Sequence, residues 1–530
     1  MDALAEARRA GRSTIGDALG RAASRYRDRV ALRFGERAWT YRALDQAAER
    51  AARQLLAAGL VPGDRVVAYG RNSDLYLIAW LGCTKAGLIH VPANYALSGR
   101  ELGYILGQSG ASLLLHDPAL AETAHSAAEG GGAGVQTFEE AMAASMGEKG
   151  ADGEEIGAGV AGGDVAQILY TSGTTGAPKG AALAHDALLS EYASCIVELE
   201  FTGRDRALAA LPLYHSAQMH VFTMPQLLAG AETVLIESPA PATCLDLIER
   251  HRITSFFAPP TVWITLLRHP GLAALDLSSL RNIYYGAAIM PVPVLSELRR
   301  RLPGARPFNC YGQSEIAPLA TVLKPDEHDA RPASVGRPVL NVRTRVVDAD
   351  LRDMAPGEPG EIVHRSPHLM LGYWNKPEET QQAFAGGWFH SGDVGSLDEE
   401  GYLYVLDRVK DVINTGGVLV ASREVEDVLF THPAVSEVAV IALPDPLWIE
   451  AVAAVVVLRE GMSASAAELI AHARGHLAPF KVPKHVMLAD SLPRNTAGKL
   501  LKRELRLRYG GTAAAVMGLE GRAAGAPGSS

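Results

Sequence analysis

Cysteine is scarce in this chain, and the few that occur are widely separated: Cys83, Cys195, Cys244 and Cys310. No two of them form the Cys-x-x-Cys pair with which structural zinc sites usually begin. The spacing also argues against the disulfide framework of a small secreted domain. We therefore expect free thiols in a reducing compartment and no zinc centre.

Long apolar runs and an excess of basic charge are also lacking. No uninterrupted apolar stretch reaches the roughly 20 residues that a membrane-spanning helix needs, and Met1–Arg9 has no apolar core of a secretory signal. The formal net charge of −9 argues against general binding to nucleic-acid phosphates. We expect a cytoplasmic protein with neither a membrane span nor a nucleic-acid partner. The sequence leaves its oligomeric state open.

With 530 residues the chain exceeds one ordinary hydrophobic core, so two or more domains are expected. Short apolar segments alternate with helical patterns, which predicts an α/β fold with at least one largely parallel sheet. We expect residues 12–60 to be largely helical, with Thr40 as an N-cap. Residues 120–163, rich in glycine, alanine and glutamate, predict a surface excursion without a chemical role.

The stretch Tyr170–Gly180 carries the strongest chemical signal. It reads Tyr-Thr-Ser-Gly-Thr-Thr-Gly-Ala-Pro-Lys-Gly and follows an apolar run, Val165–Leu169, that predicts a buried strand. Glycines let backbone N–H groups converge on an anion, hydroxyl groups add donors, and Lys179 adds a positive charge. The lysine does not directly follow the second glycine, so this is not a Walker A loop. A polyphosphate is the expected ligand.

Four further motifs follow in order: Phe308–Glu315, Gly387–Asp393, Tyr402–Asp411 and Leu492–Lys499. Together with the loop they resemble the adenylate-forming superfamily, which includes acyl-CoA synthetases, the adenylation domains of peptide synthetases and beetle luciferases. The resemblance extends from about residue 15 to 508.

The resemblance implies an α/β fold class with two domains. A large N-terminal domain of α/β subdomains plus a β-rich section is expected over residues 1–407, and a small mobile α+β C-terminal domain over 412–510. Residues 408–411 correspond to the hinge, with Lys410 at its centre. Residues 511–530 have the composition of a disordered tail.

The same resemblance assigns residues to ATP and its Mg²⁺. Glu315 is expected to bind the metal ion, Tyr311 to stack on adenine and Asp393 to accept the ribose hydroxyls, while Lys499 is the expected catalytic lysine. These roles suit the chemistry, since carboxylate oxygens are preferred Mg²⁺ ligands and aromatic rings stack on bases. The other expected nucleotide contacts are Thr171, Ser172, Gly173, Thr174, Thr175, Gly176, Lys179, Gly286, Ala287, Gly312, Ser314 and Arg408.

The acyl and CoA sites are assigned in the same way. Taken alone, His215 suits a buried core histidine. Its Pro-Leu-Tyr-His context, however, resembles the position where acyl-CoA synthetases have an aromatic or histidine residue that gates the acyl site. The expected acyl contacts are His215, Gln218, Met219, Gly286, Ala288, Gly312 and Ile316, and those for CoA are Gly416 and Gly417. This mainly apolar set predicts a hydrophobic carboxylic acid without an amino group.

The expected function is that of an acyl-CoA ligase, which forms an acyl-adenylate and pyrophosphate from ATP and then transfers the acyl group to CoA. Three alternatives stay open: an adenylating enzyme that loads a carrier protein, a specialist that only converts a pre-formed acyl-adenylate to a thioester, and a non-enzymatic ATP-binding module. Ser314, Ser391 and Asn495 stand where the family usually has threonine, and Val418-Leu419 where it usually has a polar pair. These departures leave the second half-reaction open.

Overall fold

The computed structural model describes residues 13–147, 156–157, 159–171, 177–288, 290–408, 411–415, 418–445, 448–494 and 500–510. By its contacts the chain divides into a large unit and a small unit. The large unit comprises residues 1–290, 296–344 and 363–390, and the small unit 291–295, 345–362 and 391–530. The predicted hinge contains residues 409 and 410, which lie outside the described residues, so the predicted boundaries remain predictions.

The large unit contains a seven-stranded sheet whose central strands are parallel. The strands β3, β4 and β5 are almost entirely buried, as expected when helices cover both faces of a parallel sheet. Only β8 and β18 join in the antiparallel sense. The order is β18 (Gly372–Tyr373), β8 (Lys179–Ala184), β7 (Val165–Thr171), β4 (Ile89–Ala93), β3 (Arg65–Tyr69), β5 (Leu113–His116) and β6 (Gly134–Thr137).

A nine-stranded sheet forms the second layer of the large unit. Its interior is parallel, and antiparallel strands close both edges. The order is β15 (Arg337–Pro338), β14 (Leu319–Leu323), β13 (Arg306–Gly312), β12 (Asn282–Gly286), β11 (Ser255–Phe257), β9 (Arg206–Ala209), β10 (Glu232–Leu235), β1 (Val30–Phe34) and β2 (Arg37–Thr40).

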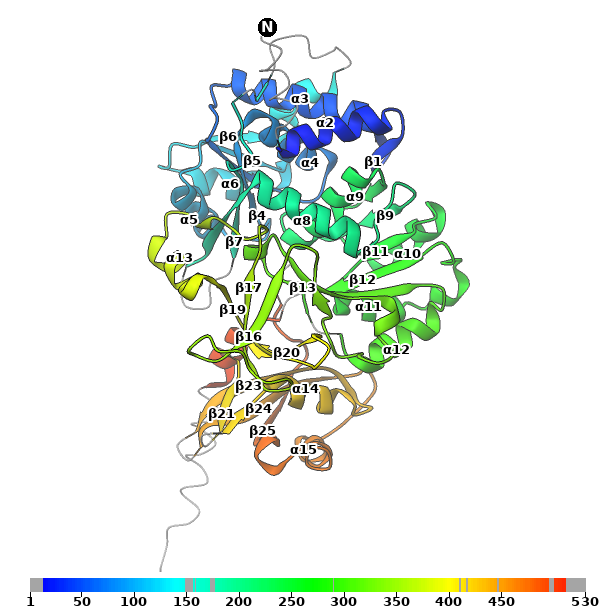
Figure 1. Cartoon of the computed structure of the whole chain (residues 1–530). Helices are drawn as coiled ribbons and strands as arrows, with labels where there is room; N and C mark the ends of the chain where they lie inside the picture. Colours follow the sequence, from blue (N-terminus) through cyan, green and yellow to red (C-terminus); the bar gives the residue numbers. More distant parts are fainter. Residues whose placement is uncertain are drawn as a thin grey trace, which may run out of the picture. The chain divides into compact units, whose positions relative to one another are not determined.

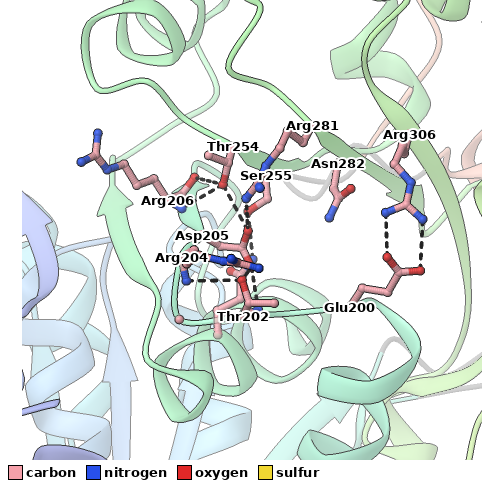
Figure 2. A network of polar contacts seen from close by, with 12 residues as sticks. Glu200, Thr202, Arg204, Asp205, Arg206, Thr254, Ser255, Arg281, Asn282 and Arg306 are labelled. Atoms are coloured by element: carbon pink, nitrogen blue, oxygen red, sulfur yellow. Dashed lines mark hydrogen bonds and ion pairs between the residues drawn. The ribbon is translucent and has the colours of Figure 1, made fainter.

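Polar side chains join the amino ends of this sheet's parallel strands (Figure 2). Asp205, only 4% exposed, accepts hydrogen bonds from the Thr202 N–H group at 2.6 Å and from Arg281 Nη2 at 2.9 Å. Arg306 donates two hydrogen bonds to Glu200 at 2.6 and 3.1 Å. These contacts stabilise the edge opposite to the strand ends at Gly286 and Gly312.

Helix α8 (His185–Glu198) packs between the two sheets, because it contacts β8 of the first and β14 of the second (Figure 1). Its buried face includes Leu188, Tyr192 and Cys195, and also the charged residue Glu191. The aromatic side chains Tyr284 and Phe308 belong to the core of the second sheet. Helix α8 therefore links the two sheets, because it packs against a strand of each.

The structure corrects two sequence-based expectations. Residues 12–60 are helical over most of their length, in α2 (Ile15–Tyr26) and α3 (Tyr41–Ala57), but they also contain the hairpin β1–β2, which was not expected. The N-cap prediction is confirmed, since Thr40 Oγ1 accepts from the Ala43 N–H group. Residues 120–163 are not only a surface excursion, because α6 (Ala121–Ala128) is followed by β6, which pairs with β5.

The remaining helical segments cover these sheets or connect their strands. One of them, η3 (Ala217–Thr223), is a π-helix, a form that is often found at functional sites. The others are α4 (Asp74–Ala86), α5 (Gly99–Ser109), η1 (Pro118–Leu120), α7 (Phe138–Ala141), η2 (Ala143–Met146), α9 (Met224–Ala229), α10 (Pro241–Arg250), α11 (Pro260–Leu267), η4 (Leu272–Ala274), α12 (Val292–Arg301), η5 (Ser314–Ile316), η6 (Pro325–Glu327), α13 (Pro377–Ala383) and η7 (Ala385–Gly387).

The rest of the chain forms a four-stranded sheet and a final α+β unit, which confirms the predicted α/β class with a smaller C-terminal part. The four-stranded sheet has the order β16 (Arg343–Val347), β17 (Gly360–Arg365), β19 (Phe389–Leu397) and β20 (Leu403–Arg408). The final sheet contains β22 (Val418–Val420), β21 (Ile413–Thr415), β24 (Ile449–Leu458) and β23 (Val435–Asp445), with β25 (His485–Leu488) paired to β24. Its helical segments are α14 (Ser422–Phe430), α15 (Ala466–Arg474) and η8 (Pro479–Lys481).

A glycine next to β15 tests how closely the backbones approach there. Gly336 has a φ of +83°, and a Cβ atom at this position would lie 1.9 Å from the carbonyl oxygen of Val322, whereas Gly63 has a φ of +91° in open space. We expect Gly336→Ala to lower the free energy of unfolding by about 3 kcal/mol or more, and Gly63→Ala by only about 1–2 kcal/mol, the strain of a left-handed alanine. Denaturant titrations measure both values. Equal losses would contradict the close approach at Gly336.

Candidate active site

The predicted phosphate loop connects two antiparallel strands of the seven-stranded sheet. β7 ends at Thr171 and β8 begins at Lys179, and these two residues are paired across the ladder. The loop's ends are therefore held next to each other by the sheet, as a loop that binds an anion requires. The predicted phosphate ligands between them, Ser172, Gly173, Thr174, Thr175 and Gly176, lie outside the described residues, and their role remains a prediction.

Beside the loop's ends, the hydroxyl groups of two residues that are distant in the chain from Glu315 meet at its carboxylate. The hydroxyl group of Tyr373 donates to Glu315 Oε1 at 3.0 Å, and that of Thr171 donates to the same oxygen at 3.4 Å. Lys179 Nζ lies 5.1 Å from the centroid of the Tyr373 ring. Burial raises the pKa of Tyr373 and the neighbouring Glu315 raises it further, so its hydroxyl group stays protonated and donates. The cluster therefore contains a carboxylate, Glu315, and the ammonium group of Lys179, both in contact with Tyr373.

The backbone also holds Glu315. Its carbonyl oxygen accepts a hydrogen bond from the Met370 N–H group at 2.8 Å. The preceding residue, Ser314, lies in the 3₁₀ turn η5 and makes a 2.9 Å hydroxyl–hydroxyl hydrogen bond with Ser216. The turn that carries Glu315 is therefore connected to the segment before η3 and to the segment before β18.

Two glycines form a close backbone contact beside this turn. A Cβ atom at Gly286 would lie 2.2 Å from the Cys310 carbonyl oxygen, and one at Gly312 would lie 1.8 Å from that of Pro318. A larger residue at Gly286 would push β12 away from β13, and one at Gly312 would push β13 away from the segment that leads into β14. Ala287 and Ala288 follow β12 and are exposed. An exposed wall of small residues can accept a flat ring, as the sequence predicts, although no described contact tests this role.

The residues predicted to contact the acyl group have different surroundings. His215 is half-buried, whereas Gln218, Met219 and Ile316 are 2%, 1% and 0% exposed. Gln218 accepts from the Leu211 N–H group and donates to Thr223 Oγ1, so its amide stabilises η3 from within. Their contact with a substrate remains a prediction.

The predicted nucleotide ligands Tyr311 and Asp393 belong to different units, and each has its own protein contacts. Tyr311 is half-buried, its hydroxyl group accepts from Gln313 Nε2 at 3.1 Å, and its ring centroid lies 6.3 Å from that of His364. In the small unit, Asp393 is 3% exposed and its N–H group donates to Ser391 Oγ at 3.0 Å. Strand pairing places Asp393 opposite Arg408.

The remaining predicted residues cannot be placed. The side chain of Arg408 and the residues Lys410, Gly416, Gly417 and Lys499 lie outside the described part of the chain. Their roles in catalysis, hinge motion and CoA binding remain predictions.

Sequence reasoning missed Tyr373 and Ser216. Tyr373 lies within a Gly-Tyr-Trp stretch and Ser216 directly follows Pro-Leu-Tyr-His, but no local pattern indicates which hydroxyl group reaches Glu315 or Ser314. Only strand pairing brings Tyr373 to the site, because β18 joins the sheet beside β8.

The oxygen atoms at this site fit a Mg²⁺ ion that arrives with ATP. Glu315 and Thr171 supply a carboxylate and a hydroxyl group, which are hard ligands of the kind that Mg²⁺ prefers. Within the described residues there is no group of three or more histidine, cysteine or acidic side chains that could hold a metal ion. One protein carboxylate suits an ion whose other ligands are phosphate oxygens and water.

The hydrogen bond from Tyr373 to Glu315 can be tested with Tyr373→Phe. The change keeps the ring beneath Lys179 and removes the donor, so we expect the affinity for Mg·ATP to fall about tenfold, the value of one hydrogen bond to a charged group. Titration calorimetry measures this affinity. Tyr69→Phe is the control, because it removes a hydroxyl group that donates to the Leu97 carbonyl in the same sheet. Equal affinities in wild type and Tyr373→Phe would contradict the contact's role.

Known proteins of similar sequence match almost the whole chain. Feruloyl-CoA synthase of an Amycolatopsis species is 39% identical over 482 residues, which cover 91% of this chain and 96% of that protein. Indoleacetate–CoA ligase of Aromatoleum aromaticum is 34% identical, with coverage of 90% and 94%. The fatty acid–[acyl-carrier-protein] ligase ScoC of Streptomyces coeruleorubidus is 35% identical, with coverage of 90% and 93%.

The fold has equally extensive matches among solved structures. The ATP-bound crystal structure of MatB from Rhodopseudomonas palustris superimposes with a TM-score of 0.88 at 32% identity, covering 94% of this chain and 99% of MatB. The family model for AMP-binding enzymes matches residues 19–374, and the model for their C-terminal domain matches residues 424–499. The chain therefore belongs to the AMP-binding enzymes, the adenylate-forming superfamily that its motifs resemble.

Proposed function

We propose that this chain is an ATP-dependent acid–thiol ligase that joins an apolar carboxylic acid to CoA. The acid's carboxylate attacks the α-phosphate of ATP to give an acyl-adenylate and pyrophosphate, and the CoA thiol then displaces AMP to give a thioester. The observation that carries this proposal is the contact of Glu315 with Thr171 and Tyr373 at the ends of the phosphate loop. The naming of the relatives as CoA ligases supports it.

The site's charges match the needs of the first step, in which two anions must approach each other. Lys179 and the loop hydroxyl groups would bind the departing pyrophosphate, and Glu315 would hold Mg²⁺, which neutralises charge on the phosphate oxygens. Lys499 would bind the attacking carboxylate. For the second step we propose that the C-terminal domain turns about Lys410, which removes Lys499 and brings Gly416 and Gly417 to the thiol.

For the acid we propose an aryl-substituted carboxylate without an amino group. Among the residues predicted to contact the acyl group, His215 is the only ionisable one, so no carboxylate is placed to pair with an ammonium group. The relatives that act on feruloyl and indoleacetyl groups have aromatic substrates. The small side chains at Gly286, Ala287 and Ala288 would allow a planar ring to lie against the backbone.

For the acceptor we propose CoA, on the basis of two exposed aromatic side chains in the small unit. Trp448 and Phe480 are each 43% exposed, and lysine ammonium groups lie over both rings, Lys484 at 4.0 Å from the Trp448 centroid and Lys481 at 5.6 Å from that of Phe480. Lys481 is paired with Glu424 at 2.6 and 2.7 Å, so the proposed phosphate contact is Lys484, beside Trp448. An aromatic ring beside a lysine suits a nucleotide, because the ring stacks on the base and the ammonium group binds phosphate. CoA contains a nucleotide, whereas the phosphopantetheine arm of a carrier protein does not.

The carrier-protein alternative keeps a specific observation in its favour, since ScoC is a ligase of that type at 35% identity. The proposed location is the cytoplasm. Within the described residues, no helix combines the length and the apolar character that crossing a bilayer requires.

The proposed reaction is tested by incubating the protein with ATP, Mg²⁺ and a panel of ferulate, indoleacetate, fatty acids and amino acids, with and without CoA. We expect pyrophosphate release with the aryl acids and a thioester only when CoA is present. Lys499→Ala should lower pyrophosphate release about a hundredfold or more, as expected for the loss of a charge-assisted contact to the reacting groups.

The other outcomes either support a named alternative or contradict the proposed class of acid. Pyrophosphate without a CoA thioester indicates a carrier-protein acceptor, and a thioester formed only from a synthetic acyl-adenylate indicates the thioesterifying specialist. Tight selection of amino acids over apolar acids would contradict the proposed acyl class.

The proposed CoA contact is tested separately with Trp448→Ala. We expect the KM for CoA to rise about tenfold, the cost of losing one base–aromatic stack, while the KM for pantetheine, which lacks the nucleotide, stays unchanged. Leu488→Ala, which removes an exposed apolar side chain from the same unit, is the control. An equal rise for CoA and pantetheine would exclude nucleotide stacking at Trp448.

A further inference from the structure

The core of the large unit contains a carboxyl side chain, Glu191, to which the proposed reaction assigns no role. Glu191 on α8 is fully buried, which is costly for a carboxylate unless hydrogen bonds or an opposite charge compensate. Its Oε1 atom accepts from the Leu319 N–H group at 3.0 Å and from the Cys195 thiol at 3.4 Å. Burial raises the pKa of Glu191, and the contact with His368 opposes the rise.

The second oxygen of Glu191 faces a fully buried histidine. His368 Nδ1 lies 3.2 Å from Glu191 Oε2, and His368 Nε2 lies 3.1 Å from Ser194 Oγ. Ser194 Oγ also lies 3.2 Å from the Ser190 carbonyl oxygen, to which it can donate. The contact between His368 Nδ1 and Glu191 Oε2 has the distance of an ion pair but not the geometry of a hydrogen bond. The two side chains therefore form a close, fully buried polar contact.

Glu191 thereby connects the two chain segments that hold Glu315. Leu319 begins β14, four residues after Glu315, and its N–H group is bound by Glu191. His368 precedes Met370, whose N–H group donates to the Glu315 carbonyl, and Tyr373, whose hydroxyl group donates to the Glu315 carboxylate. One buried carboxylate thus binds the segment after Glu315 and the segment whose donors fix it.

We propose that Glu191 and His368 are positioning residues for the Mg²⁺ site of the adenylation step, because they fix the orientation of Glu315 from α8. This role rests on the proposed function of Glu315 as a ligand of nucleotide-bound Mg²⁺. Displacement of a catalytic group by about 1 Å can cost about a hundredfold in rate. Glu191 holds the Leu319 segment by a hydrogen bond, which restricts direction as well as distance, and faces His368 of the other segment at 3.2 Å. Apolar packing alone would hold the two segments less accurately.

The proposal separates the two half-reactions. In the proposed reaction adenylation would need the Mg²⁺ that Glu315 would hold, whereas thioester formation would begin after pyrophosphate has left. A residue that only stabilises the fold would affect both steps alike. A residue that positions Glu315 would affect the first step and the Mg²⁺-dependent part of ATP affinity.

The test uses the full-length protein with Glu191→Met, Glu191→Gln and His368→Asn. Methionine has a similar length and removes both acceptors, and asparagine is too short to reach both Glu191 and Ser194. Glutamine keeps the side-chain length, an acceptor for the Leu319 N–H group and a polar group facing His368, so it should rescue the contact. Asp205→Asn is the matched control, because it changes another buried carboxylate at the opposite edge of the strands (Figure 2).

Three quantities are measured: the ratio of ATP dissociation constants with EDTA and with Mg²⁺ by calorimetry, the rate of pyrophosphate release, and thioester formation from a synthetic acyl-adenylate. We expect Glu191→Met and His368→Asn to lower the first two about tenfold or more, and to change the third less than about twofold. Glu191→Gln and Asp205→Asn should stay within about twofold of wild type in all three.

Parallel loss of all three quantities with a lowered melting temperature in Glu191→Met and His368→Asn would assign the pair a structural role only and overturn the proposal. Wild-type behaviour of both variants would overturn it as well. A wild-type protein that shows no Mg²⁺-dependent ATP binding and no pyrophosphate release would overturn the proposed function, and this inference with it.

Discussion

The hydrogen bond between Tyr373 and Glu315 is the contact on which the candidate site depends. It joins β18, at the edge of the seven-stranded sheet, to the turn after β13 of the nine-stranded sheet. Thr171 reaches the same carboxylate from the strand that enters the phosphate loop. The end of the loop and the expected metal ligand are therefore held by one small network rather than by two independent loops.

The rest of the large unit supports this meeting point. Parallel strands place their carboxyl ends at one edge, which is where α/β sheets usually bind ligands. There the close contact at Gly286 keeps β12 and β13 together, and the one at Gly312 keeps β13 close to the segment that leads into β14. Helix α8 contacts both sheets, and Glu191 within it binds backbone and side-chain groups on either side of Glu315. The opposite edge is stabilised by ordinary surface ion pairs and by Asp205. The ion pairs and the candidate site thus lie at opposite edges of the same strands.

The predicted fold class and family are confirmed because they depend on local patterns. Apolar strands, helix caps such as Thr40 and a dense glycine–hydroxyl loop each need only a few neighbouring residues. The hairpin at β1–β2 was missed for the opposite reason. β1 pairs in parallel with β10, about 200 positions later in the chain, and that pairing outweighs the helical tendency of the flanking segments. The strand β6 was likewise hidden in a glycine-rich stretch and is defined by its partner β5.

The sequence by itself determined which chemical groups are available: the loop with Thr171 and Lys179, the carboxylates of Glu315 and Asp393, and the lysine at 499. These groups are identified by the resemblance of their motifs to those of the adenylate-forming superfamily, because each motif is a short stretch that can be found without knowledge of the fold. Only the tertiary structure decided which hydroxyl groups reach Glu315. It also brings Glu191 and His368 together at the two chain segments that hold Glu315. These contacts join residues that are 58 to 177 positions apart. Such pairs arise from the packing of two sheets around one helix, and no local pattern contains that information.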